Sequence, residues 1–125
     1  HPQVADVLNR VRQPFNVNSL ALAAAVAALA DEAYLTESRQ LNLDGMRQLE
    51  QGFSELGLQW IPSRGNFIAV DLGRDAGPVY QGLLRAGVIV RPVAGYEMPN
   101  HLRVSIGLQA ENQRFLEALA GVLGQ

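Results

Sequence analysis

The stretch Gly87–Gly107, GVIVRPVAGYEMPNHLRVSIG, constrains the fold more than any other part of the sequence. It predicts two β-strands joined by a loop, because β-branched residues are dense on both sides of a segment marked by glycine and proline. Each expected strand carries one arginine, Arg91 and Arg103. An unpaired charge in an otherwise apolar strand is costly, so each guanidinium group needs a partner.

Two interpretations of Arg91 and Arg103 stay open at this point. Guanidinium groups on neighbouring strands can converge on one anion, because their planar donors match the oxygens of a carboxylate or a phosphate. Alternatively, each arginine is bonded to a nearby aspartate or glutamate in an ion pair that is only structural.

Composition excludes several classes of function. A chain of 125 residues makes one domain of ordinary size, and a net charge of −2 gives no indication of nucleic-acid binding. No uninterrupted apolar run reaches the roughly 18 residues of a membrane span. Cysteine is absent, which suits a cytoplasmic location. With His1 and His101 as the only histidines, no metal site is expected. His101 is interpreted as a solvated loop residue in preference to a general base.

The N-terminal third of the chain predicts two helices, at 2–12 and 19–34. The second, SLALAAAVAALADEAY, is rich in alanine and has few polar residues before Asp31. Such a helix must be covered on most sides, either within a core or by a part of the protein outside this chain.

Alternation and helical spacing define the rest of the chain. The predicted helices span 35–57, 78–86 and 109–122, and the predicted strands span about 58–62, 66–72, 87–91 and 102–107. This order indicates an α+β fold in which helices pack on one face of a small, mostly antiparallel sheet of about four strands.

The residues that carry most enzyme chemistry are missing. Lysine and arginine together number ten, and all ten are arginine, so no side-chain amine is available for a Schiff base. The sequence contains neither a phosphate-binding P-loop nor a nucleophile elbow. No catalytic residue is expected within this chain.

Several segments resemble the histidinol-phosphate aminotransferase family, which belongs to the fold-type I pyridoxal-phosphate aminotransferases. They occur in the family's order and spacing: RQPFNVN at 12–18, PS and NF between 62 and 67, GVIVRP at 87–92, LRVSIG at 102–107, and EN at 111–112. The resemblance covers nearly the whole chain and is closest to the C-terminal part of these enzymes.

The resemblance implies a fold, a reaction and a site. The fold is the aminotransferase small domain, expected at residues 35–125, and the connecting helices, expected within residues 1–34, join it to a large cofactor-binding domain. The reaction moves an amino group between L-histidinol phosphate and 2-oxoglutarate during histidine biosynthesis, with pyridoxal 5′-phosphate as cofactor. The arginine matching Arg103 holds the carboxylate or phosphate of the substrate, and the one matching Arg91 assists. Asn16 and Tyr96 are further candidates that line the site.

The resemblance also implies what lies outside this chain. The lysine and arginine that hold the cofactor are upstream in the family, as is the large domain, and the full-length enzymes form homodimers. Three alternatives remain open: a stand-alone domain that binds an amino acid or phosphate through Arg91 and Arg103, another class I or II aminotransferase, and a structural segment whose alanine-rich helix belongs in an interface.

Overall fold

The computed structural model describes residues 1–12 and 17–124, and divides the chain into two compact units, His1–Glu37 and Ser38–Gln125. The first unit contains helices α1 (Pro2–Val11) and α2 (Ser19–Ala30). The side chain of Asn18 caps α2 by accepting a hydrogen bond of 2.8 Å from the N–H of Ala21. No side chain in either helix is buried, so the apolar residues of α2 are exposed.

Asp31 ends the alanine-rich helix earlier than the sequence predicts. Instead of running to residue 34, α2 stops at Ala30, and the Asp31 carboxylate accepts a hydrogen bond of 3.0 Å from the N–H of Tyr34. This N-cap starts α3 (Glu32–Glu55), three residues before the predicted start at 35. Within residues 1–12 and 17–124, no single helix is long and apolar enough to span a membrane; α2 and α3 meet that test only as a bent pair, by length and composition.

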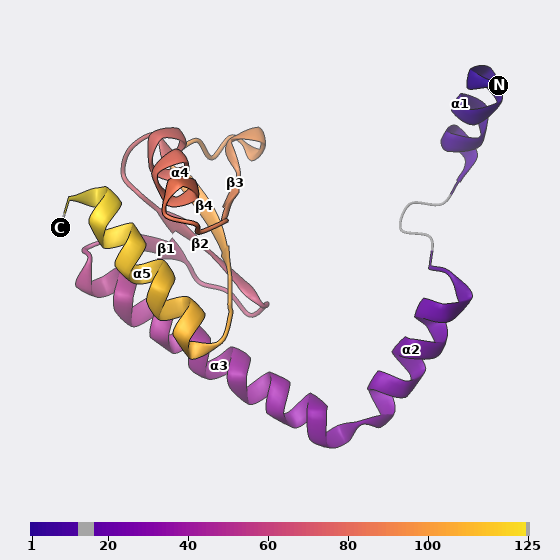
Figure 1. The fold of residues 1–125 in the computed structure, drawn as a ribbon, viewed down its shortest axis with the longest axis horizontal. Coiled ribbons are helices and arrows are strands. Elements are labelled where there is room, and N and C mark those ends of the chain that lie inside the picture. Colours follow the sequence, from indigo (N-terminus) through magenta and orange to yellow (C-terminus); the bar gives the residue numbers. More distant parts are fainter. Residues whose placement is uncertain (13–16, 125) are drawn as a thin grey trace. The chain divides into compact units, whose positions relative to one another are not determined.

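The second unit is built around one antiparallel sheet, which confirms the predicted α+β class (Figure 1). Its strands lie in the order β1-β2-β4-β3. The remaining elements are β1 (Gln59–Ile61), β2 (Phe67–Asp71), α4 (Ala76–Arg85), β3 (Arg91–Pro92), the 3₁₀ turn η1 (Ala94–Tyr96), β4 (His101–Ser105) and α5 (Gln109–Leu123).

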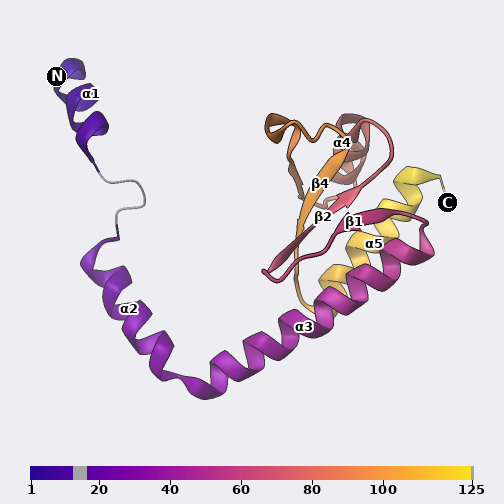
Figure 2. The same ribbon diagram turned by 180° about the vertical axis from the view of Figure 1, so that it is seen from behind.

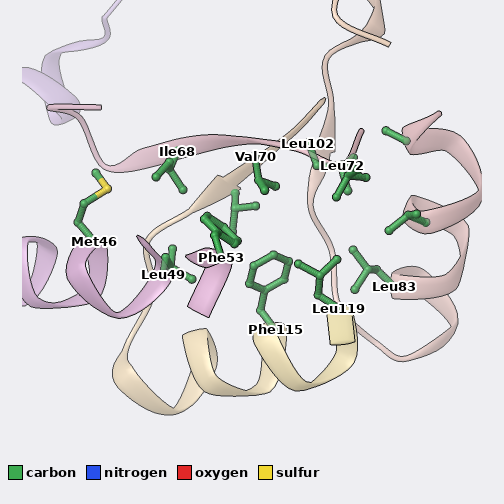
Figure 3. Close-up of a cluster of buried hydrophobic side chains, with 13 residues drawn as sticks. Met46, Leu49, Phe53, Ile68, Val70, Leu72, Leu83, Leu102, Phe115 and Leu119 are labelled. Atoms are coloured by element: carbon green, nitrogen blue, oxygen red, sulfur yellow. The ribbon is translucent and has the colours of Figure 1, made fainter. Parts of the chain in front are cut away.

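Helices α3 and α5 lie side by side on one face of the sheet in both views (Figures 1 and 2). Between them and the sheet, Phe53 of α3 and Phe115 of α5 meet edge to face, with ring centroids 6.1 Å apart. The inward residues of the central strands complete this core, and the first turns of α4 close its end (Figure 3). Each fully buried apolar side chain of this size contributes about 1.5–3 kcal/mol, so this face of the sheet is fixed by burial.

The third strand is shorter than the predicted span of 87–91. Gly87 has a φ of 76° and closes α4 in the left-handed conformation that glycine adopts at little cost. Its N–H donates to the carbonyl of Leu84, and the N–H of Val88 donates to the carbonyl of Leu83. These two backbone donors finish the helix, and pairing with β4 begins only at Arg91.

Candidate anion site on the open face of the sheet

The two arginines that stand out in the sequence lie directly opposite each other. In the antiparallel register of β3 and β4, Arg91 pairs with Arg103. Opposed residues of an antiparallel pair share one face of the sheet, and their Cβ atoms are about 4.5–5.5 Å apart. Both guanidinium groups therefore start from neighbouring points on one face, within reach of a single anion.

This face is opposite the one on which α3 and α5 pack (Figures 1 and 2), and we call it the arginine face. Because side chains alternate along a strand, the buried Ile68, Val70 and Leu102 point toward α3 and α5, and their neighbours point the other way. The arginine face is formed by Phe67, Ala69 and Asp71 of β2, His101, Arg103 and Ser105 of β4, and Arg91 of β3.

Neither arginine of this face is neutralised by a carboxylate in the described part of the chain. The ion pairs found there join Arg10 to Asp6, Arg47 to Asp44, and His101 to Asp71. The structure therefore gives no support to the interpretation of Arg91 and Arg103 as members of structural ion pairs. Like charges that face each other across two strands are unfavourable, and an anion between them would relieve that repulsion.

The guanidinium group of Arg103 is held by an aromatic ring. Its Cζ atom lies 4.6 Å from the centroid of the Phe67 ring, in the geometry of a cation–π contact. The Nε atom of Arg103 is buried, and within the described residues no hydrogen-bond partner reaches it. Sequence analysis missed this contact, although the alternation of FIAVD in β2 places Phe67 on the same face as Asp71.

His101 lies on β4 and not in a solvated loop, so that interpretation was wrong. It pairs across the strands with Asp71, and its Nε2 atom is 3.9 Å from Oδ2 of that carboxylate. This separation is too long for a hydrogen bond, and it becomes an ionic contact only when the imidazole is protonated. The Nδ1 atom is buried without a partner in the described residues. The pair adds a titratable group to the arginine face, two residues from Arg103.

Of the other two predicted site residues, the structure describes Tyr96, and no hydrogen bond or ion pair among the described residues joins it to Arg91 or Arg103. Tyr96 is exposed and ends the 3₁₀ turn η1, which connects β3 to β4. Asn16 lies outside the described residues. In the part of the chain that is described, no three histidine or acidic side chains gather as metal ligands do.

A network of amide groups holds the C-terminal end of β4 in place. Asn112 of α5 is 2% exposed; its Oδ1 accepts from the N–H of Gly107 at 2.9 Å, and its Nδ2 donates to the carbonyl of Gly107 at 3.1 Å. The same Nδ2 lies 3.2 Å from Oε1 of Gln48, whose own Nε2 donates to the carbonyl of Gln109. Three elements are thus joined at one point, four residues beyond Arg103.

The backbone of α3 approaches this network closely at Gly45. A Cβ atom there would lie 2.5 Å from Cγ2 of Ile106 and 2.9 Å from Nδ2 of Asn112, so any larger residue would push the turn away. A cleft of about 510 Å³ also opens beside the turn, lined mainly by residues 87–90, 104–107 and the first turns of α5. Neither arginine lines this cleft, so its size does not make it the anion site.

Comparison with known proteins places these features in a family. The family described as "Aminotransferase class I and II" matches residues 1–119. Among curated proteins, histidinol-phosphate aminotransferase 2 of Pseudomonas fluorescens is 77% identical over 124 residues, which cover 99% of this chain and 34% of that protein. The enzyme of the same name from Pseudomonas aeruginosa is 78% identical over 120 residues, which cover 96% of this chain and 32% of that protein.

A solved structure agrees with the sequence relatives. Histidinol-phosphate aminotransferase from Sinorhizobium meliloti, in complex with pyridoxal-5′-phosphate, superimposes with a TM-score of 0.77 at 30% identity, covering 98% of this chain and 35% of that one. The chain thus spans about a third of the length of the relatives it matches.

Proposed function

Because the chain belongs to the class I and II aminotransferase family, we propose that it forms the C-terminal part of a histidinol-phosphate aminotransferase and supplies that enzyme's substrate-anion site. The observation that carries the proposal is the opposed pair Arg91 and Arg103, which lacks a carboxylate partner among the described residues. The high identity to named histidinol-phosphate aminotransferases supports a substrate phosphate or carboxylate as the anion.

The reaction would transfer an amino group from L-histidinol phosphate to 2-oxoglutarate, giving imidazole acetol phosphate and L-glutamate. One substrate carries a phosphate and the other a carboxylate, and a guanidinium group presents paired donors that fit either anion. In this proposal Arg103 binds the anionic group of both substrates, and Arg91 assists from the neighbouring strand. Asn16 and Tyr96 are proposed to line the site.

The cofactor would be held elsewhere in the full-length protein. Pyridoxal phosphate supplies the electron sink for transamination and is held by a lysine, and this chain contains none. No residue of the chain is therefore assigned to the cofactor. The role proposed for this chain is to bind and orient the anionic end of the substrate.

The full-length protein is proposed to contain a second domain and to form a dimer in the cytoplasm. Residues 35–125 form the small domain, and residues 1–34 connect it to a large domain that carries the cofactor. The exposed apolar side chains of α2 support burial against other parts of such an assembly, because apolar patches of this kind rarely stay in water. We further propose that the full-length protein is a cytoplasmic homodimer.

The chain by itself is expected to be catalytically silent. Purified alone and supplied with pyridoxal phosphate, it should give no measurable transfer of an amino group from L-histidinol phosphate to 2-oxoglutarate, because it has no lysine to hold the cofactor. Formation of L-glutamate is the measurement.

The full-length protein that carries this chain, assayed in parallel, is the control and should turn over both substrates. Turnover by the chain alone would contradict the expectation. A full-length protein that binds phosphate through Arg91 and Arg103 but transfers no amino group would favour the stand-alone binding domain instead.

A further inference from the structure

The contact between Phe67 and Arg103 assigns a role to an apolar residue that the sequence did not single out. We infer that Phe67 is a positioning residue, whose ring holds the guanidinium plane of Arg103 in the orientation that receives the substrate anion. This inference rests on the proposed function of Arg103. It adds a residue that acts through that arginine and does not itself bind the anion.

The first step of the argument is the register. Phe67 pairs with Ser105, and Ala69 pairs with Arg103, so Phe67 is the diagonal neighbour of Arg103 on the arginine face. Diagonal neighbours on one face are within reach of aromatic and long side chains. The residue directly opposite Arg103 is Ala69, and its small side chain leaves room above β2 for the Arg103 side chain and the Phe67 ring to meet.

The second step concerns the polar restraints on that guanidinium within the described residues. No hydrogen bond or ion pair found there holds Arg103, and its Nε atom is buried without a partner. The Phe67 ring, 4.6 Å from Cζ, is the contact that fixes the plane. A carboxylate partner would neutralise the charge of the arginine and occupy some of its N–H donors. An aromatic ring orients the guanidinium group and leaves those N–H donors free to bind a ligand.

The third step is the chemistry of the two anions. A carboxylate and a phosphate present oxygen pairs of different shape, and a guanidinium binds each through parallel N–H donors only when its plane is correctly set. A freely rotating arginine must lose rotamer entropy each time an anion binds. A ring that sets the plane beforehand reduces that loss equally for both substrates.

The inference is tested first on the chain itself, with inorganic phosphate as the probe. In the wild type, the NMR signals of the Arg103 side chain should show an upfield ring-current shift and should respond to added phosphate. In Phe67→Leu the ring-current shift should disappear, and the affinity for phosphate should fall about 3- to 30-fold. Phe67→Tyr and Phe67→Trp, which keep a ring, should stay within about twofold of wild type.

Ile61→Ala is the matched control. Ile61 pairs with Ala69 and so lies on the same face of the sheet, with an exposure of 47% against 39% for Phe67. It belongs to β1, two strands away from β4. Its truncation should leave both the Arg103 signals and the affinity for phosphate unchanged, while the loss of apolar surface is comparable.

The full-length enzyme provides the second readout. Phe67→Leu should raise the KM for glutamate and for histidinol phosphate by similar factors with a smaller change in kcat, and the aromatic variants should restore both. On an Arg103→Met background, Phe67→Leu should cause no further loss, because the group that it positions is gone.

Two results would overturn the inference. An effect on only one of the two substrates would mean that Phe67 contacts that substrate directly. Loss of the ring-current shift with unchanged affinity for phosphate would mean that the ring only packs against Arg103 and does not position it for the anion. Because the phosphate titration does not depend on transamination, it decides the role of Phe67 even if the full-length protein has a different activity.

Discussion

Arg103→Lys in the full-length protein is expected to lower the rates of both half-reactions by about 30- to 5,000-fold, which corresponds to a loss of about 2–5 kcal/mol in transition-state stabilisation. Lysine keeps the charge but replaces a planar fork by a single ammonium group, which cannot donate in parallel to two oxygens. The stack on Phe67 is also weakened, since the flat guanidinium that covers the ring is lost. Single-turnover kinetics with glutamate and with histidinol phosphate measure the effect.

Arg91→Lys is the internal comparison for that experiment. Arg91 is exposed at the edge strand of the sheet, where water can replace part of its contact. Its substitution should therefore cost less than that of Arg103 for both substrates. Rates near wild type for Arg103→Lys would show that this residue is a structural part of β4 and would remove the basis of the proposed site.

Asn112→Leu is expected to lower the free energy of unfolding by about 2–4 kcal/mol, because it leaves the half-buried N–H and carbonyl of Gly107 without these partners. Leucine is close to asparagine in size, so the loss reflects hydrogen bonding more than a cavity. Urea unfolding of the chain followed by the fluorescence of Trp60, the only tryptophan, provides the measurement. Trp60 suits this purpose because its ring lies 6.0 Å from that of Phe53 in the core.

Two variants calibrate the Asn112 result. Asn112→Asp keeps an acceptor for the N–H of Gly107 but loses the donor to its carbonyl, so an intermediate loss is expected. Gln113→Leu removes an exposed side chain that bonds only along its own helix to Glu117, and should change stability by no more than about 0.5 kcal/mol. Equal stability of Asn112→Leu and Gln113→Leu would contradict the structural role of the network.

The sequence predicted the layers of this fold because each layer has its own period. Alternation in FIAVD and LRVS identifies strands with one buried face, and the apolar stripes of α3 and α5 identify the helices that cover it. The predicted ends of the helices were wrong where a single residue ends one helix and starts the next. In the sequence, Asp31 is one polar residue within a predicted helix, yet its carboxylate can cap a new helix just as well, and the apolar pattern does not select between the two.

The predicted span of β3 was wrong for a different reason. The run Gly-Val-Ile-Val has high strand propensity, but propensity does not show whether a backbone donor is already used. The N–H groups of Gly87 and Val88 finish α4, so neither residue enters the ladder. The acceptors belong to the preceding helix, and the strand propensity of this run does not take them into account.

The candidate site was predictable in its charges but not in its geometry. Two arginines in apolar strands need anionic partners, either a ligand or carboxylate side chains, and that inference needs no register. The opposition of Arg91 and Arg103, and the position of Phe67 beneath the guanidinium, depend on how β2, β3 and β4 are aligned, and a shift of one residue would send each side chain to the other face. The buried amide network around Asn112 was equally hidden, since its partners are far apart in the sequence.

The opposed arginines also make the stability of this chain depend on its solvent. β3 is only two residues long and lies at the edge of the sheet, and one of its two pairs with β4, Arg91 and Arg103, carries two like charges. An anion that binds the folded chain at a hundred times its dissociation constant adds about 2.7 kcal/mol to the free energy of unfolding. A melting temperature measured in phosphate buffer therefore describes the protein together with its counterion, and a chloride buffer of the same ionic strength reports the strand pair without that support.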